Sequence, residues 1–303
     1  MQQTSALKGH IAALVTIAVW GTTFLSSKVL LESFSPVEIL FFRYALAYAA
    51  LWILHPKPMK LQDKKHEWLF AGAGLCGVTL YTLFEVNALS LSYASNVSVI
   101  VSSAPFFCGV FAVLFLKEDR LRPAFFAGFA VAITGIALIS FSGATELRLN
   151  PLGDLLALGA AIVWGVYSIL TRRLGQSGYN SFAMTRRVFF WALTFMPPAM
   201  ALFGFRLDLT RLAEPKNLLN MLFLGLVASA LCYVSWNTAL GALGTTRASV
   251  YIYLMPVITV VASVFLLRER ITAASAVGMA LTIAGLFLSG FQGAKTRVDP
   301  RGR

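Results

Sequence analysis

Long apolar runs dominate the chain, and short polar or Pro- and Gly-containing breaks separate them. Because the hydrocarbon core of a bilayer is about 30 Å thick, a crossing helix needs about 20 mostly apolar residues. Ten runs meet this requirement: residues 10–30, 36–54, 68–91, 95–116, 122–141, 152–171, 181–203, 217–240, 247–267 and 272–291. The pattern predicts an all-α polytopic membrane protein of ten transmembrane helices with short connections.

The composition agrees with this prediction. Hydrophobic residues make up 58% of the chain and charged residues only 13%, with a mean hydropathy of +0.74. Soluble domains carry about a quarter charged residues, so this surface is expected to face lipid. The three cysteines and three histidines are scattered through the chain. They predict no disulfide, no metal site and no cofactor.

The net charge of +12 could indicate a nucleic-acid partner or the orientation of the chain in the membrane. The basic residues lie between the apolar runs, which favours the second explanation. If the N-terminus is cytoplasmic, the cytoplasmic segments hold 15 Lys and Arg residues and the opposite segments hold 6. Short cytoplasmic loops are enriched in Lys and Arg. The bias predicts that both termini are cytoplasmic, including a basic tail at residues 294–303.

The chain contains an internal duplication. Trp20-Gly21 recurs as Trp164-Gly165 at an offset of 144 residues, and Arg43 recurs as Arg187 at the same offset. Further along, the offset becomes 151, and the repeated positions there are Pro105 with Pro256 and Ser98-Val99 with Ser249-Val250. We expect two five-helix repeats, residues 8–143 and 150–293. Five is odd, so the second repeat crosses in the opposite sense, as in the inverted repeats of many secondary transporters.

These duplicated features resemble the drug/metabolite transporter superfamily, in its EamA-like ten-helix family, over about residues 8–291. The resemblance implies an inner (plasma) membrane carrier, with a central cavity between the halves, that exports amino acids or related small metabolites. It does not fix the substrate, and a multidrug exporter of cationic compounds is the alternative. The spans hold no His or Asp cluster for an intramembrane enzyme and no filter-like segment for a channel. A chain that carries both repeats is predicted to be complete as a monomer.

Glu85 is the one carboxylate well inside a predicted span. A charge at that depth costs about 2.5–3.5 kcal/mol on insertion scales, so Glu85 should face a partner or a water-filled cavity. One interpretation is a structural ion pair with Arg43. The other is that Glu85 binds a substrate ammonium group or a coupling proton.

Aromatic and polar side chains of the central spans suit a concave site for a small amphipathic molecule. The predicted substrate-binding residues are Trp20, Tyr81, Glu85, Asn96, Ser98, Trp164, Tyr167, Trp236 and Tyr251. For any single aromatic residue, packing is the alternative role.

Four further residues are predicted to have structural or gating roles: Arg43, Pro105, Arg187 and Pro256. The two prolines lie near mid-span, where each would form either a gating hinge or a static kink. Arg187 lies close enough to the cytoplasmic side to snorkel. Gly128 and Gly135, with their counterparts Gly278 and Gly285, are predicted to let helices approach closely.

Overall fold

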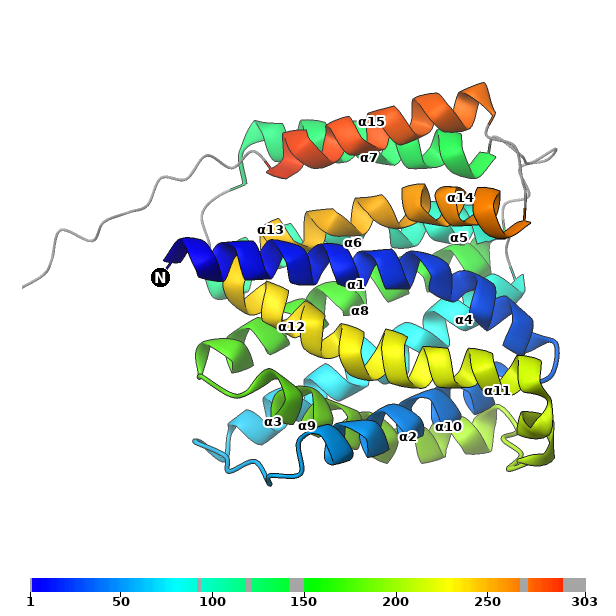
Figure 1. Cartoon of the computed structure of the whole chain (residues 1–303). Helices are drawn as coiled ribbons and strands as arrows, with labels where there is room; N and C mark the ends of the chain where they lie inside the picture. Colours follow the sequence, from blue (N-terminus) through cyan, green and yellow to red (C-terminus); the bar gives the residue numbers. More distant parts are fainter. Residues whose placement is uncertain (1, 92–93, 118–120, 142–149, 268–271, 291–303) are drawn as a thin grey trace, which may run out of the picture.

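The computed structural model describes residues 2–91, 94–117, 121–141, 150–267 and 272–290, and every regular element in these ranges is helical. The helices lie side by side along a common direction (Figure 1). The α-helices are α1 (Gln2–Leu31), α2 (Pro36–Leu54), α3 (His66–Gly74), α4 (Tyr81–Leu91), α5 (Ala94–Val101), α6 (Ala104–Leu116), α7 (Pro123–Phe141), α8 (Pro151–Gln176), α9 (Ser181–Thr194), α10 (Met196–Leu202), α11 (Pro215–Leu222), α12 (Cys232–Leu243), α13 (Thr245–Ser249), α14 (Leu254–Leu267) and α15 (Ala273–Gly290). Two π-helical segments, η1 (Leu75–Leu80) and η3 (Phe223–Leu231), and two 3₁₀ segments, η2 (Thr210–Ala213) and η4 (Val250–Tyr253), complete the set.

Seven helical stretches of the described chain are long and apolar enough to cross a bilayer, and Pro123–Ile139 is a shorter apolar helix. The seven are Pro36–Leu54, His66–Leu91, Val99–Leu116, Pro151–Gln176, Pro215–Leu243, Thr245–Ala262 and Ala273–Gly290. The predicted class, an all-helical polytopic membrane protein, is therefore confirmed. Helix α1 and the consecutive helices α9 and α10 lie in the same bundle (Figure 1).

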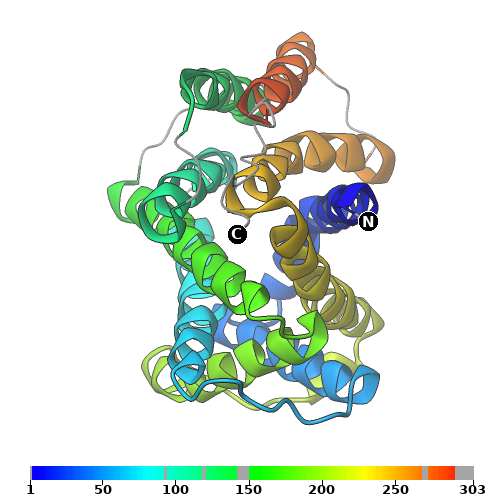
Figure 2. The same cartoon turned by 90° about the vertical axis from the view of Figure 1, so that its left-hand side faces the viewer.

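The helices form two groups that face each other. Helix α1 packs against α12, η3 and α14, whereas α8 packs against α3, α4, α5 and α6. Seen along the helices, these groups stand on opposite sides of the centre, with α2 and α9 at one edge and α7 and α15 at the other (Figure 2). The first helix of each sequence repeat thus packs against helices of the other repeat, which interlocks the two halves.

Equivalent positions of the repeats make equivalent contacts. A Cβ atom added to Gly21 would lie 2.7 Å from Ile258, and one added to Gly165 would lie 3.1 Å from Phe107. Gly165 is the counterpart of Gly21 at the offset of 144, and Ile258 is the counterpart of Phe107 at the offset of 151, so the two contacts are equivalent. The offset of 151 also maps η1 onto residues 226–231, which are the end of η3. The duplication seen in the sequence is therefore also present in the structure, while the exact repeat boundaries stay a prediction.

Helices α7 and α15 form the closest helix pair and run antiparallel. A Cβ atom added to Gly285 would lie 2.6 Å from the Gly128 carbonyl oxygen, and one added to Gly135 would lie 2.5 Å from the Gly278 carbonyl oxygen. Only glycine fits where two backbones approach this closely. The predicted role of these four glycines is confirmed, and α7 and α15 point in opposite directions.

The duplicated prolines lie at helix starts and do not kink a continuous helix. Pro105 is the second residue of α6, after a turn at Ser102 and Ser103, and Pro256 is the third residue of α14, after the 3₁₀ segment η4. In a first turn, the missing N–H of proline breaks no helical hydrogen bond. The interruptions predicted at these positions are present, but each break comes before its proline.

Candidate functional site

A cavity lies between the two helix groups, and its volume together with the solvent at its open side is about 550 Å³. Its walls come from α1, α2, α4, α5, α6, α8, α12, η4 and α14. The lining residues are Trp20, Thr23, Arg43, Tyr44, Tyr81, Thr82, Glu85, Val101, Ala104, Trp164, Tyr233, Ile252 and Met255. Aromatic walls with a few charged and hydroxyl groups are typical of sites for small molecules.

Part of this lining is symmetric between the repeats. Four pairs of lining residues occupy equivalent positions: Trp20 with Trp164, Thr82 with Tyr233, Val101 with Ile252, and Ala104 with Met255. The cavity therefore lies on the axis that relates the two halves. The other five lining residues all belong to the first half: Thr23, Arg43, Tyr44, Tyr81 and Glu85.

The equivalent region of the second half is filled with side chains. Tyr167 and Trp236, the counterparts of Thr23 and Glu85, are fully buried. The Tyr167 hydroxyl donates to Asn237 Oδ1 at 3.0 Å, and Asn237 Nδ2 donates to Thr185 Oγ1 at 3.0 Å. The central cavity thus extends to one side of the symmetry axis, whereas the positions equivalent to Thr23 and Glu85 on the other side are filled.

The two charges in the cavity are not paired with each other. Arg43 Nε donates to Ser229 Oγ at 2.5 Å, and the Tyr81 hydroxyl donates to Glu85 Oε1 at 3.1 Å. Among the described side chains, no ion pair within 4.0 Å joins Arg43 to Glu85. The structural ion pair expected from their similar depth does not form in this conformation. A guanidinium and a carboxylate therefore both face the same cavity.

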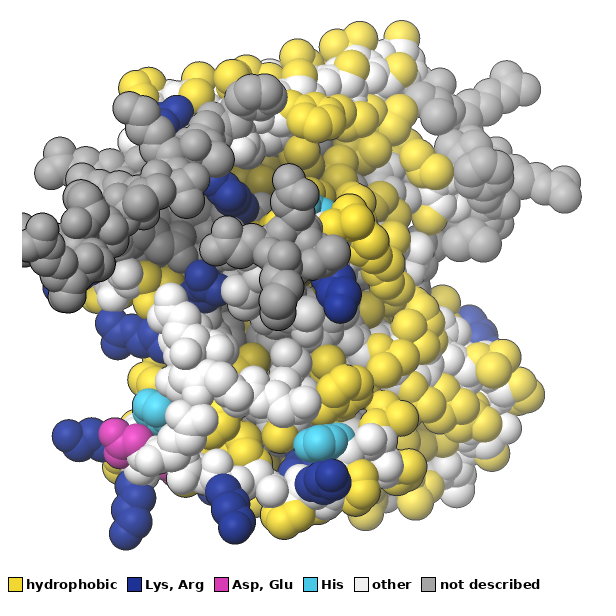
Figure 3. All heavy atoms as spheres, turned by 60° about the vertical axis from the view of Figure 1, so that its left-hand side comes forward, with side chains coloured by type: hydrophobic (Ala, Val, Ile, Leu, Met, Phe, Trp, Pro, Cys, Tyr) yellow, Lys and Arg dark blue, Asp and Glu magenta, His cyan; other side chains and the backbone are white. Residues whose placement is uncertain are grey.

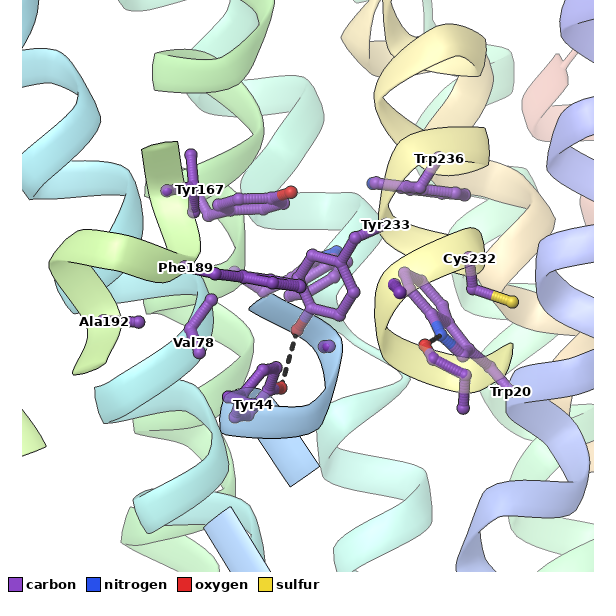
Figure 4. Packing of buried hydrophobic residues seen from close by; sticks show 14 of the residues in the cluster. Trp20, Tyr44, Val78, Tyr167, Phe189, Ala192, Cys232, Tyr233 and Trp236 are labelled. Atoms are coloured by element: carbon purple, nitrogen blue, oxygen red, sulfur yellow. Dashed lines mark hydrogen bonds between the residues drawn. The ribbon is translucent and has the colours of Figure 1, made fainter. Parts of the chain in front are cut away.

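Aromatic rings from several helices lie close together in the core, among them those of Trp20, Tyr44, Tyr167, Tyr233 and Trp236 (Figure 4). The repeated tryptophans meet edge to face, with a distance of 5.3 Å between the ring centroids of Trp20 and Trp164. Tyr233 contacts both rings, and its hydroxyl lies 3.1 Å from that of Tyr44. Edge-to-face geometry is favourable for aromatic pairs, so these rings form a continuous layer between the helix groups.

The sequence profile of the EamA-like transporter family matches this chain twice, at residues 7–141 and at residues 151–291. The chain belongs to the EamA-like transporter family. This membership makes the protein a membrane transporter rather than an enzyme.

Relatives and a solved structure agree with this assignment. An uncharacterized transporter of Archaeoglobus fulgidus is 27% identical over 93% of this chain and 97% of the relative. A probable amino-acid metabolite efflux pump of Escherichia coli is 24% identical (94% and 95% coverage), and a probable terminal-alkyne amino-acid exporter of Streptantibioticus cattleyicolor is 28% identical (91% of each). A crystal structure with a TM-score of 0.79 and 19% identity, covering 95% of this chain and 97% of the other, has the same fold.

In this EamA-like transporter, some of the predicted site residues line the cavity and others do not. Trp20, Tyr81, Glu85 and Trp164 line it, as does Arg43. Tyr167 and Trp236 lie on the filled side instead, and the Tyr251 hydroxyl is 2.6 Å from His10 Nδ1. Neither Pro105 nor Pro256 lines the cavity. The side chains of Asn96 and Ser98 lie outside the described part of the structure.

Sequence reasoning missed several lining residues, among them Thr23, Tyr44 and Thr82. Tyr44 directly follows Arg43. Thr82 and Tyr233 are counterparts at the offset of 151, but one is a small hydroxyl residue and the other is aromatic. The repeat offset leads from the predicted residue Tyr167 to the lining residue Thr23, but no predicted site residue leads to Tyr44 or Thr82.

Arg187, the counterpart of Arg43, faces a different environment. Its guanidinium donates to both Glu67 carboxylate oxygens, at 2.9 and 2.8 Å, and Trp191 Nε1 donates to the same carboxylate at 2.5 Å. It also lines a second pocket, of about 490 Å³, together with Trp52 and Phe190. Arg187 is therefore held by an ion pair and does not simply snorkel.

Outside the spans, an ionic network joins the halves at the end of the bundle where α2 begins. Arg211 forms an ion pair with Glu38 at 2.9 Å and another with Asp208 at 3.2 Å. The hydrogen bond to Glu38 raises the pKa of Arg211, and hydrogen bonds from Thr210 lower the pKa of Asp208. Both groups thus stay charged near neutral pH.

Proposed function

We propose that this EamA-like transporter is a secondary active carrier that exports amino acids or related small metabolites across the inner membrane by alternating access. The observation that carries the proposal is the central cavity, which lies on the symmetry axis and extends into the first half, while Tyr167 and Trp236 fill the equivalent positions of the second half. The two halves interlock as equivalents, so exchanging their conformations would close the hollow side and open the filled one. The names of the E. coli and Streptantibioticus relatives favour amino-acid compounds.

The proposal includes ten crossings in one chain, acting as a monomer. Six crossings would be α1, α2, α7, α8, α9 with α10, and α15; the other four would be the broken segments α3–η1–α4, α5–α6, α11–η3–α12 and α13–η4–α14. The start of α1 and the end of α15 lie at the same end of the bundle (Figure 1), as an even number of crossings requires. Lys and Arg side chains gather at this end (Figure 3), which supports a cytoplasmic location for it.

In this orientation, the cavity opens towards the outer face, because Arg43 and Glu85 lie in the outer halves of α2 and of the segment α3–η1–α4. The inward-open state would expose the region of Tyr167 and Trp236. We propose that the breaks before Pro105 and Pro256 act as the bending points between the two states. Ala104 and Met255, each directly before one of these prolines, line the cavity, so bending there would change its shape.

Glu85 is proposed to bind the substrate ammonium group or a coupling proton, with Tyr81 orienting the carboxylate. Trp20 and Trp164 would contact the apolar part of the substrate. The same carboxylate and rings would suit a cationic drug, which is the second candidate. The Arg43 guanidinium in the same cavity disfavours a purely cationic substrate through like-charge repulsion.

Counterflow in proteoliposomes tests the proposal. Vesicles with purified protein are loaded with one unlabelled amino acid, and uptake of the labelled form is followed. Transient accumulation is expected for some amino acids and should be lost in Glu85→Gln. Accumulation of cationic drugs in place of every amino acid would overturn the substrate class, and uptake without counterflow would overturn the carrier mechanism.

A further inference from the structure

The two repeated tryptophans differ in their hydrogen bonds. Trp20 Nε1 donates to the Ala228 carbonyl oxygen at 2.9 Å, a contact between the first helix of one half and the third span of the other. By the repeat offsets, the equivalent acceptor for Trp164 is the Gly77 carbonyl oxygen. That oxygen instead accepts a hydrogen bond from the Tyr233 hydroxyl at 3.1 Å.

Trp164 Nε1 consequently has no hydrogen-bond partner among the described residues, although the residue is only 4% exposed. A buried N–H without an acceptor is unfavourable, and such groups in native proteins usually bind water or a ligand. Trp236 Nε1 is also without a partner, but Trp236 does not line the cavity. Trp164 does line it, so a substrate bound in the cavity would contact the indole that carries this N–H.

Arg43 offers donors in the same cavity. Its Nε is used by Ser229, whereas neither terminal guanidinium nitrogen has a hydrogen bond to any described residue. A guanidinium fork binds a carboxylate with two parallel hydrogen bonds. Glu85 supplies the opposite charge within the same cavity and is not paired with Arg43. One guanidinium and one carboxylate that remain unpaired in one cavity are complementary to a zwitterion.

We infer that the Trp164 indole N–H and the terminal nitrogens of Arg43 bind the carboxylate of a zwitterionic substrate, while Glu85 binds its ammonium group. The inference rests on the proposed transport function and adds the group that each residue recognises. Tyr233 is a positioning residue in this site, because its hydroxyl occupies the Gly77 carbonyl and leaves the Trp164 N–H free.

Competition in counterflow distinguishes recognition of the carboxylate from simple packing. The competitors are a transported amino acid and the corresponding amine, which keeps the ammonium group and side chain but has no carboxyl oxygen to accept a hydrogen bond. In Trp164→Phe, the affinity for the amino acid should fall about tenfold while that for the amine is unchanged. The control variant Trp68→Phe makes the same substitution at an exposed tryptophan outside the cavity, so the ratio of the two affinities should stay as in the wild type.

Tyr233→Phe is an independent variant, which also serves if Trp164→Phe does not fold. Losing the hydroxyl leaves the Gly77 carbonyl, the acceptor equivalent to that of Trp20, available to Trp164, so the amino acid should again lose affinity relative to the amine. Equal losses for both ligands, or no loss for either, in both variants would overturn the inference while leaving transport established. If folded wild-type protein exchanges no amino acid, the proposed function itself is overturned.

Discussion

The two halves of the molecule share a scaffold but differ in the residues that face the cavity. Trp20 and Trp164 meet at the centre in equivalent positions, and the glycine contacts of one half recur in the other. In contrast, Glu85 corresponds to Trp236, and Thr82 corresponds to Tyr233. The shared positions fix how the helices pack, which gives two equivalent ways of opening. The unequal positions put the polar chemistry in the first half, so substrate recognition need not be symmetric.

The largest expected effect comes from breaking the shared scaffold. In Gly285→Ala, the added Cβ would lie 2.4 Å from the Ala132 backbone nitrogen, where no side chain can move aside. We expect a loss of about 3 kcal/mol in the free energy of unfolding, measured by thermal or denaturant unfolding in detergent. Gly241→Ala is the matched control, because nothing lies within 4 Å of its added Cβ. Alanine there should be neutral or slightly stabilising, and equal stability of the two variants would contradict the close packing of α7 and α15.

A second change tests the polar chemistry of the first half without touching the scaffold. In Glu85→Gln, counterflow should fall by about 10- to 100-fold, because a charged hydrogen-bonding partner of the substrate is lost. Thermal stability should be kept, since removing a charge from the membrane lowers a desolvation cost. Glu32→Gln, which only breaks an exposed ion pair with Lys216, is the control. Wild-type exchange with an unchanged pH profile in Glu85→Gln would exclude Glu85 from the site.

The smallest effect is expected at the duplicated helix breaks. Pro256→Ala and Pro105→Ala should each slow the maximal counterflow rate about threefold, which corresponds to less than 1 kcal/mol in the barrier. Substrate affinity and unfolding temperature should stay near those of the wild type, because neither proline lines the cavity. Unchanged turnover in both variants would show that the helix breaks are static and have no role in gating.

The sequence predicted the scaffold well because duplication marks it twice. Trp20 with Trp164, and Gly128 and Gly135 with their counterparts, were identified by their order and offset alone. The candidate site was predicted less completely. Tyr167 and Trp236 occupy positions equivalent to cavity residues, and only the conformation decides which side of the axis is hollow. Likewise, similar depth suggested a pair between Arg43 and Glu85, but the contact of Arg43 with Ser229 crosses between the halves and depends on their packing.

Access to the cavity from the two faces of the membrane tests the central claim most directly. Val101 and Ile252 are equivalent residues that both line the cavity, and each can be replaced by cysteine after Cys76, Cys108 and Cys232 are removed. A membrane-impermeant thiol reagent is then applied to sealed vesicles from one face at a time. Alternating access predicts that both positions react from either face. It also predicts that substrate changes the ratio of the reaction rates from the two faces. Reaction from one face only, with and without substrate, would contradict the account.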